Sequence, residues 1–514
     1  MAKFYKNSVW ASMGPIPVVG TGTNFLLLSS LLLILIGLNK HFTWVPETLF
    51  LIPILLFIVT SFVVGSPISR LLSIILTVFT PFEYLAYIIP FLYIPRVFLS
   101  QRNSTLPKSV KFFLLLLVFW VVICWGVSQA RELNLLSLVL FSITFLSPFI
   151  VMIGISMEKI SWIETKLFLH IFIWFSLIQL IPVLVGQIVY TDWLPGDRHF
   201  GSLKSTNELA FVMIAALTVV IFDRSRKIAN IMSWRDGILI PLLTCTYLLI
   251  MSDTKHLLLC LVITGLLYAL VRGVASKKLS VERKILFLSL VILGSLLMVL
   301  IIPYLGDLYI KYVLKDENRT TRDYLAVYMD PNHKLVFAQR IFSKDYPWFV
   351  GSGPGTISSK ASNSRASDTM YKERGSRLFN LVEPFTSKLA KEYYVDLYDE
   401  EWAMKVQWTS ATLTNPFSSL LAVIAELGIS GCCILVFLYL SIVFSAENLK
   451  TGDSMRDYVI VVGQIWAILI FIASLFDTYM EVAQLMLLTT LFVALPYANK
   501  IRNMEVAKVM KWAG

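Results

Sequence analysis

Long apolar runs, separated by polar segments, follow one another along most of this chain. An α-helix needs roughly 20 apolar residues to cross the hydrocarbon core of a bilayer. Runs of about that length are predicted at residues 24–39, 45–65, 70–95, 110–128, 135–156, 167–190, 208–222, 237–251, 256–272, 284–305, 417–445, 457–476 and 480–498. The pattern therefore predicts an all-α polytopic integral membrane protein with about 12–14 transmembrane helices.

The apolar run at 70–95 differs from the others because it contains Pro81, Glu83 and Pro90. Proline breaks helices, so this run is either two short tilted helices or a re-entrant segment. A single crossing here would make the total odd and put the N-terminal lysines outside the cell, against the positive-inside rule. Either alternative restores an even number of crossings and a cytoplasmic N-terminus.

One polar segment, residues 306–412, is much longer than the other connections. Helical patches at 335–342 and 387–394 and a high aromatic content predict that it is a folded, mostly helical loop. The chain is accordingly divided into an N-terminal transmembrane bundle at 1–305, the large extracytoplasmic loop at 306–412, C-terminal transmembrane helices at 413–498 and a cytoplasmic tail at 499–514.

Lysine and arginine predict which side of the membrane each segment faces. They are concentrated in the linkers 223–236 and 272–284 and in the C-terminal tail, which fall on one side if each intervening span crosses once. By the positive-inside rule that side is the cytoplasm. The segments 190–206 and 252–256 and the large loop then share the outer face.

Composition narrows the class further. Hydrophobic residues make up 57% of the 514 residues and charged residues 15%, against about 25% charged in soluble domains. The net charge of +11 comes from short linkers rather than from the loop, so nucleic acid is not an expected partner. The five cysteines lie in apolar runs without a CxxC or Cys/His cluster, so neither a metal site nor a cofactor is predicted.

The first segment with candidate chemistry contains Arg198, Lys204 and Asn207 and leads into the span 208–222. Free amides at a helix N-terminus favour anions, and two cations lie beside them in the sequence. This arrangement predicts a phosphate-binding site. The alternative is an interfacial loop whose basic residues meet lipid headgroups.

The second segment is the tight outer turn at 252–256. Lys255 lies at the start of a span, where ionisable residues are costly and often functional. The alternative is a lysine that reaches the interface and pairs with Asp253.

The third segment lies in the large loop. Lys334 and Arg340 precede a glycine-rich turn that contains Gly353 and Gly355, and Lys360 begins a cationic run after it. Glycine-rich loops expose backbone amides and let a ligand approach closely. The alternatives are a set of ordinary turns and, for the cationic run, a solvated face.

The fourth segment belongs to the span 417–445. Glu426 is a carboxylate within an apolar stretch, so we expect it to pair with a cation. Gly428 and Gly431 allow a kink or close helix packing. The alternative for Glu426 is a salt bridge at a helix start without a catalytic role.

Taken together and in this order, the four segments resemble the O-antigen polymerase and O-antigen ligase superfamily of bacterial envelopes, over roughly residues 190–445. Members carry Arg-x-x-Gly…Asn before a mid-chain helix, a basic residue in a short outer turn, Gly-x-Gly-x-Gly in a large periplasmic loop, and a helix with Glu-x-Gly-x-x-Gly. The matching residues are Arg198, Gly201, Asn207, Lys255, Gly351, Gly353, Gly355, Glu426, Gly428 and Gly431.

Two departures from the family pattern lie at the start of the last helix. The family's catalytic-site histidine falls on Phe417 and the neighbouring asparagine on Ser418. Ligases of lipid A core depend on that histidine. The resemblance therefore favours a divergent polysaccharide-polymerase branch that lacks it.

The resemblance implies a metal-independent glycosyltransferase, without a cofactor, in the bacterial inner membrane. It would polymerise or ligate undecaprenyl diphosphate-linked oligosaccharides on the outer face of that membrane, for O-antigen, capsule or exopolysaccharide. Its partners would be this lipid-linked glycan, membrane lipid and other envelope polysaccharide assembly proteins. The rival function is a transporter or flippase for polysaccharide or lipid-linked sugar, which would hold its substrate near the midplane between two halves.

The implied reaction needs cations that stabilise a departing diphosphate and a base for the acceptor hydroxyl. Arg198 and Glu426 are the candidate catalytic residues, for the first and second role respectively. The residues expected to bind the diphosphate are Arg198, Lys204, Asn207, Lys255, Lys334, Arg340, Gly353 and Gly355.

Overall fold

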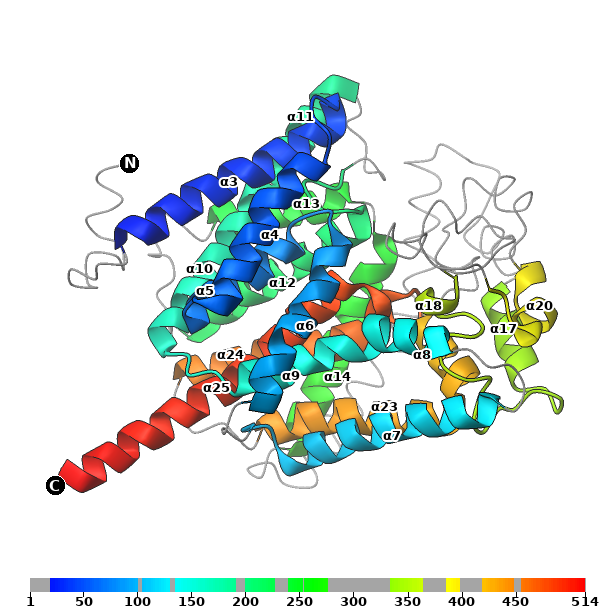
Figure 1. The fold of residues 1–514 in the computed structure, drawn as a ribbon. Helices are drawn as coiled ribbons and strands as arrows, with labels where there is room; N and C mark the ends of the chain where they lie inside the picture. The colour runs from blue at the N-terminus through cyan, green and yellow to red at the C-terminus, as the bar shows by residue number, and fades with distance from the viewer. Residues whose placement is uncertain are drawn as a thin grey trace.

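The computed structural model describes residues 19–99, 104–129, 135–190, 199–226, 239–252, 254–275, 333–363, 385–397, 418–447 and 454–513. Every regular element in these ranges is a helix (Figure 1). The predicted span at 284–305, most of the large loop and both boundaries assigned to that loop lie outside the described residues.

The N-terminal bundle contains helices that follow the predicted spans closely. They are α3 (Val19–Phe42), α4 (Thr48–Val63), α5 (Pro67–Val78), α6 (Glu83–Leu99), α7 (Lys108–Gln129), α8 (Leu135–Phe141), the π-helical turn η1 (Ser142–Leu146), α9 (Ser147–Ser156), α10 (Trp162–Ile178), α11 (Leu180–Tyr190), α12 (Thr206–Arg226), α13 (Leu239–Met251) and α14 (Lys255–Ala275).

The rest of the chain supplies loop helices and the C-terminal helices. The former are α17 (His333–Ile341), α18 (Lys360–Asn363), α20 (Lys388–Tyr393) and the 3-10 turn η3 (Val395–Leu397). The latter are α23 (Ser419–Glu447), α24 (Ser454–Ala473), the 3-10 turn η4 (Tyr479–Glu481) and α25 (Ala483–Ala513). The last helix continues without interruption through the segment predicted as a separate tail.

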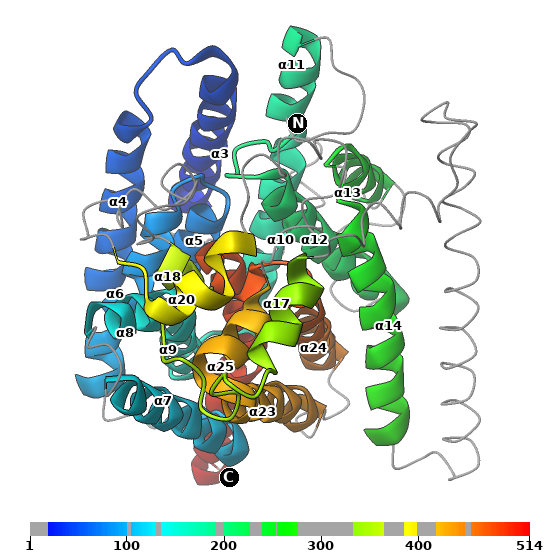
Figure 2. The ribbon, with the colours of Figure 1, turned by 90° about the vertical axis from the view of Figure 1, so that its right-hand side faces the viewer.

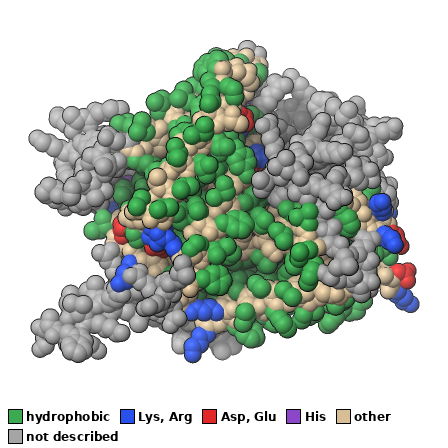
Figure 3. Space-filling model, in the orientation of Figure 1, with side chains coloured by type: hydrophobic (Ala, Val, Ile, Leu, Met, Phe, Trp, Pro, Cys, Tyr) green, Lys and Arg blue, Asp and Glu red, His purple; other side chains and the backbone are tan. Residues whose placement is uncertain are grey.

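Five helical stretches in the described residues are long and apolar enough to cross a membrane. They are Phe25–Phe42, Lys108–Ser128, Leu135–Ser156, Trp162–Tyr190 and Ser419–Ala446, and shorter apolar helices accompany them. Large apolar side chains also cover the outer surface, on α4 and α7 among others. They spread across the middle of the face in Figure 3, with charged side chains nearer its edges. These features indicate a membrane-embedded helical protein.

The apolar run at 70–95 forms two helices, α5 and α6, separated at residues 79–82. The break exposes backbone carbonyls that other elements satisfy. Ser202 Oγ donates to the Phe79 carbonyl at 2.6 Å, and Gln484 Nε2 donates to the Thr80 carbonyl at 3.1 Å. Since buried backbone groups need partners, these bonds fix the break against the segment before α12 and the start of α25.

The apolar core lies where α25 packs against α9, α24 and α5. Aromatic rings join these helices to α10. Phe492 of α25 lies 5.6 Å from Phe172 and 6.1 Å from Trp466, measured between ring centroids. A second pair, α7 and α23, lies side by side along one edge of the bundle (Figures 1 and 2).

The described parts of the large loop form a small layer at one end of α23 (Figure 2). Helices α17 and α20 correspond to the patches predicted at 335–342 and 387–394, which confirms those two predictions. Their apolar side chains share a core with α23, formed by Phe337, Ile341, Tyr346, Ile357, Ala390, Tyr393, Tyr394, Leu397 and Ala425. These parts of the loop are therefore folded onto the bundle.

Candidate functional site

Glu83, at the break between α5 and α6, binds two lysines from distant parts of the chain. Its Oε2 lies 2.8 Å from Lys204 Nζ, and its Oε1 is bonded to Lys360 Nζ. The Tyr87 hydroxyl also donates to Oε1, at 3.0 Å. The Glu83 side chain is only 4% exposed, so burial of its charge requires these partners.

The backbone amides of the same two lysines are each held by a further glutamate. Lys204 N donates to Glu208 Oε2 at 3.0 Å, and Lys360 N donates to Glu481 Oε2. Both glutamates are buried. Three carboxylates thus fix two lysines, one in the segment before α12 and one at the start of α18. We call these five residues the shared-carboxylate cluster.

The charges of the cluster depend on burial and on pairing. Burial raises the pKa of Glu481 to about 8, so this carboxyl holds a proton at neutral pH. Burial alone would lower the pKa of Lys204, but Glu83 outweighs it and the net shift is upward. The Lys204 side chain is 41% exposed, whereas that of Lys360 is 17% exposed. The cluster is therefore open to the surroundings mainly through Lys204.

Glu426 is completely buried, and its carboxylate accepts four backbone N–H groups of the glycine-rich segment 351–359. Gly355 N donates to Oε2 at 2.5 Å. Ile357, Ser358 and Ser359 donate to Oε1 at 3.1, 3.1 and 2.9 Å. Within the described residues, converging backbone amides bind the Glu426 carboxyl, as in other backbone anion sites. Its pairing with a cation stays a prediction.

A kink in α23 brings Glu426 to this segment. Gly428 has φ +70° and ψ 178°, a backbone conformation that is essentially restricted to glycine. The interrupted helix bonds to the loop: Ile429 N donates to the Trp348 carbonyl at 2.8 Å, and Ser352 N to the Ala425 carbonyl at 2.8 Å. The kink allowed by Gly428 is therefore the point at which the large loop joins α23.

Two positions of the loop segment require glycine because of their backbone conformation and their close neighbours. Gly353 and Gly355 have φ +104° and +71°, and a Cβ on them would lie 2.4 Å from Ser128 Oγ and 2.5 Å from the Ser137 carbonyl oxygen. Their amides are also engaged, since Gly353 N donates to the Glu426 carbonyl at 2.9 Å and Gly355 N to its side chain. The observed contacts match the alternative of a tight turn.

The two other cations predicted in the loop point to different neighbours. Lys334 Nζ donates to the Phe476 carbonyl, between α24 and η4. Burial lowers the Lys334 pKa to about 8, opposed by Asp477. Arg340 Nη1 donates to the Tyr393 carbonyl at 3.2 Å, within the loop layer. Lys334 thus faces the C-terminal helices, whereas Arg340 supports the loop.

The remaining predicted residues are only partly described. Arg198 and Phe417 lie outside the described residues, and so does the side chain of Lys255, the first residue of α14. Asn207 is the second residue of α12 and is half-buried. Ser418 accepts from Leu421 N at 3.2 Å and so caps the start of α23.

Three of the four sequence segments meet through these contacts. The segment before α12 and the loop segment are joined by Glu83, and the loop segment and α23 by Glu426. Among the described residues, no hydrogen bond or ion pair is seen between the turn at 252–256 and these three segments. Sequence reasoning missed Glu83 and Glu481 as site residues. The signal for each was a lone carboxylate in or beside an apolar run, next to Pro81 in one case and near the start of 480–498 in the other.

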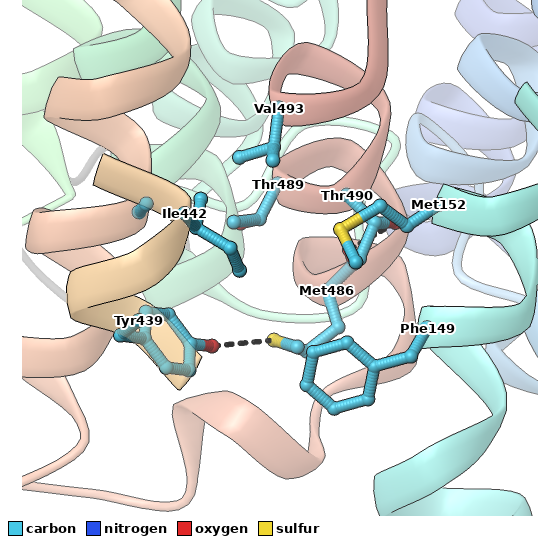
Figure 4. A pocket seen from close by; sticks show the side chains of 9 residues that line it. Phe149, Met152, Tyr439, Ile442, Met486, Thr489, Thr490 and Val493 are labelled. Atoms are coloured by element: carbon cyan, nitrogen blue, oxygen red, sulfur yellow. Dashed lines mark hydrogen bonds between the residues drawn. The ribbon is translucent and has the colours of Figure 1, made fainter. Parts of the chain in front are cut away.

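A small pocket lies elsewhere, between α9, α23, α24 and α25 (Figure 4). It is lined mainly by apolar side chains, and the Tyr439 hydroxyl donates to Met486 Sδ across it at 3.9 Å. Its free space holds about one water molecule. It is too small for a glycan or a lipid chain.

The described residues contain no group of three or more His, Cys, Asp or Glu side chains that could hold a metal ion. Comparison with protein-family models and with curated proteins finds no match for the chain. The chemistry of the shared-carboxylate cluster and of the Glu426 contacts is therefore the basis for a function.

Proposed function

We propose that this protein is a membrane glycosyltransferase that transfers an undecaprenyl diphosphate-linked glycan onto a sugar hydroxyl of a second glycan. The observation that supports it is the shared-carboxylate cluster. There, two lysines from the segment before α12 and from the outer loop converge at one end of the bundle. A diphosphate leaving group needs such fixed cations in a poorly hydrated place.

The reaction proceeds by attack of the acceptor hydroxyl on the anomeric carbon of the donor. The new glycosidic C–O bond forms while the anomeric C–O bond to phosphate breaks, and the bonding electrons leave with the lipid diphosphate. The hydroxyl proton passes to an oxygen of the departing diphosphate, which gains negative charge as its bond breaks. Cations lower the barrier because the leaving group gains negative charge as its bond breaks. In this proposal Arg198, Lys204 and Lys334 supply such charge.

Glu426 takes a positioning role in this proposal rather than that of the base. A base needs a lone pair within reach of the acceptor proton, whereas both Glu426 oxygens already accept backbone N–H groups. To remove a proton from the acceptor, Glu426 would have to break hydrogen bonds to these backbone amides. Its contribution is to hold the glycine-rich segment, and through it Lys360, against the bundle.

The loop layer favours this function over a transporter. Helices α17 and α20 share an apolar core with α23, and Lys360 of the loop binds Glu83 of the bundle. A transporter substrate site is expected at the midplane between two halves instead, without a folded loop that supplies part of it.

The test is deletion of the gene, followed by gel analysis of surface polysaccharide length. Loss of long chains with retention of single units on the lipid carrier would support polymerisation, whereas loss of all surface glycan would indicate a flippase. Unchanged chain length would contradict both.

Complementation with variants then tests the mechanism at matched protein levels. Arg198→Ala should abolish long chains, because losing one such electrostatic contact typically costs about 10²–10³ in rate. Arg198→Lys keeps the charge but not the bidentate fork and should retain partial activity. Lys391→Ala, an exposed lysine on α20, is the matched control and should leave chain length unchanged. Full chain length with Arg198→Ala would rule out a diphosphate-binding role for Arg198.

A further inference from the structure

The shared-carboxylate cluster has a feature that its structural role does not require. Two ammonium groups from chain positions 204 and 360 bind the two different oxygens of one carboxylate, Glu83. A fold needs one counter-ion per buried charge, so a single lysine would suffice for Glu83. Glu83 thus binds one ammonium group more than the neutralisation of its own charge requires.

The backbone contacts keep both lysines in place whatever their ammonium groups bind. Lys204 N is held by Glu208 at 3.0 Å, and Lys360 N by Glu481. Each lysine has a flexible four-carbon stem beyond that anchor. An ammonium group can therefore change its partner while the backbone around it stays fixed.

Glu83 is also able to release a lysine. The Tyr87 hydroxyl donates to Oε1 at 3.0 Å, independently of both lysines. If Lys204 moves away, the carboxylate still keeps Tyr87 and Lys360 as partners, so a buried charge is not left unpaired. Lys204, the more exposed of the two lysines, is the one that an approaching ligand meets first.

We propose that Lys204 and Lys360 bind the diphosphate of the lipid-linked substrate and that Glu83 takes the place of the diphosphate until the substrate arrives. Glu83 then gives up Lys204 to phosphate oxygens, keeps Tyr87 and shares the Lys360 ammonium group with the ligand. This inference rests on the proposed function and adds Lys360 and Glu83 to the site. Glu83 is a positioning residue, since it acts through the lysines. The ligand class is a prenyl diphosphate, whose oxygens form charge-assisted bonds to ammonium groups as a carboxylate does.

The exchange predicts opposite effects for the two kinds of residue. Removing a lysine removes an attractive charge from the ligand, so Lys204→Met and Lys360→Met should each weaken binding by about tenfold or more. Glu83→Gln removes the competing carboxylate and raises the local charge by one, so binding should become about three- to tenfold tighter. A merely structural Glu83 would give weaker binding in all three variants.

The experiment is calorimetric titration of farnesyl diphosphate into the purified full-length protein in detergent. Farnesol and inorganic pyrophosphate serve as separate probes for the lipid chain and for the free diphosphate. Lys391→Met, which removes an exposed lysine on α20, is the matched control and should bind as the wild-type protein does. Added phosphatidylglycerol should not displace the probe.

The possible results separate the two proposals. No binding of farnesyl diphosphate by the wild-type protein would contradict the proposed function itself. If the wild-type protein binds farnesyl diphosphate and Lys360→Met and Lys204→Met leave the affinity unchanged, only this inference is overturned. The same holds if Glu83→Gln weakens binding as a loss of either lysine is expected to do. Displacement by an equal amount of phosphatidylglycerol would assign the lysines to lipid headgroups and overturn it as well. If Glu83→Gln does not fold, Lys204→Met decides alone, because its side chain lies at the surface of the cluster.

Discussion

At the scale of single residues, two buried glutamates are stabilised in different ways. Glu426 accepts hydrogen bonds from four backbone N–H groups, which offset part of the cost of burying its charge. Glu481 has one oxygen bonded to Lys360 N, and its Oε1 has no hydrogen-bond partner in the described structure. Hydrogen bonds to the charged form favour ionisation, whereas burial without them favours the neutral acid. The two side chains should therefore respond differently to substitution and to pH.

Glu426→Gln should destabilise the protein by about 2 kcal/mol and make the large loop more sensitive to protease. The amide replaces one acceptor oxygen with a donor, which then faces a backbone N–H such as that of Gly355. Thermal unfolding and limited proteolysis in detergent measure both effects. Glu392→Gln, on the exposed face of α20, makes the same substitution in the loop layer and should change neither. Equal stability of the two variants would refute the role of Glu426 in holding the glycine-rich segment.

Glu481 should make the protein less stable as the pH rises. Its folded pKa of about 8 lies above the ordinary value of 4.5, so between these values the folded protein holds a proton that the unfolded chain releases. Stability is then highest near the lower value and falls towards pH 8, by at most about 1.4 kcal/mol per pH unit. Comparing unfolding temperatures at pH 5.5 and 7.5 should show a larger loss for the wild-type protein than for Glu481→Gln. An identical loss in both would contradict the shifted pKa.

At the scale of elements, breaks in helices position the site. Residues 79–82 separate α5 from α6 and present Glu83, while Gly428 interrupts α23 and presents Glu426. Each break frees backbone groups, and other parts of the chain bond to them. Irregular backbone within a bundle is stable only where neighbours satisfy it. The breaks are therefore the places where distant segments join.

Gly428→Ala should destabilise the protein strongly, by at least about 2 kcal/mol. A Cβ at this position would lie 2.1 Å from the Phe349 carbonyl oxygen, and the backbone conformation excludes alanine in any case. Yield of folded protein after gel filtration and the unfolding temperature are the measurements. Gly126→Ala, on the partner helix α7, meets no atom within 4 Å and provides the control. Gly126→Ala should be neutral or slightly stabilising, because alanine favours helix. If Gly428→Ala gave the same yield and unfolding temperature as Gly126→Ala, the kink would not be needed.

At the scale of the whole molecule, apolar and charged surfaces are separated. Apolar side chains cover the middle of the bundle, the loop layer lies at one end of α23, and ion pairs lie at both ends of α5 (Figures 2 and 3). A bilayer imposes this separation, because charged groups avoid its hydrocarbon core unless they are paired. Which of the two ends faces the outside stays a prediction from the positions of lysine and arginine.

Single-cysteine labelling of intact cells tests that orientation. Lys391→Cys, exposed on α20 of the large loop, should react with a membrane-impermeant reagent, whereas Lys277→Cys in the linker 272–284 should react only after the membrane is permeabilised. The background needs replacement of the native cysteines, of which Cys433 is exposed. Labelling of Lys277→Cys in intact cells would refute the topology and, with it, the placement of the site on the outer face.

Hydropathy and local composition were sufficient for the helical class, for most helix positions and for the two loop patches, because each depends on residues close together in the sequence. The glycines at 428 and 431 leave a kink or close helix packing open, and the structure has a kink at Gly428. The apolar run at 70–95 forms two helices, which is one of the two alternatives that its prolines predict, and α25 is continuous through residues 499–513.

The partners of the buried charges were decided only by the tertiary structure. Glu83 lies 121 residues from Lys204 and 277 from Lys360, and no spacing rule connects them. Glu426 is bound by backbone amides, which every residue except proline carries and which therefore leave no mark in the composition. The sequence determines that a buried charge must be paired; packing determines which group comes within bonding distance, since long-range contacts depend on how all the helices are arranged.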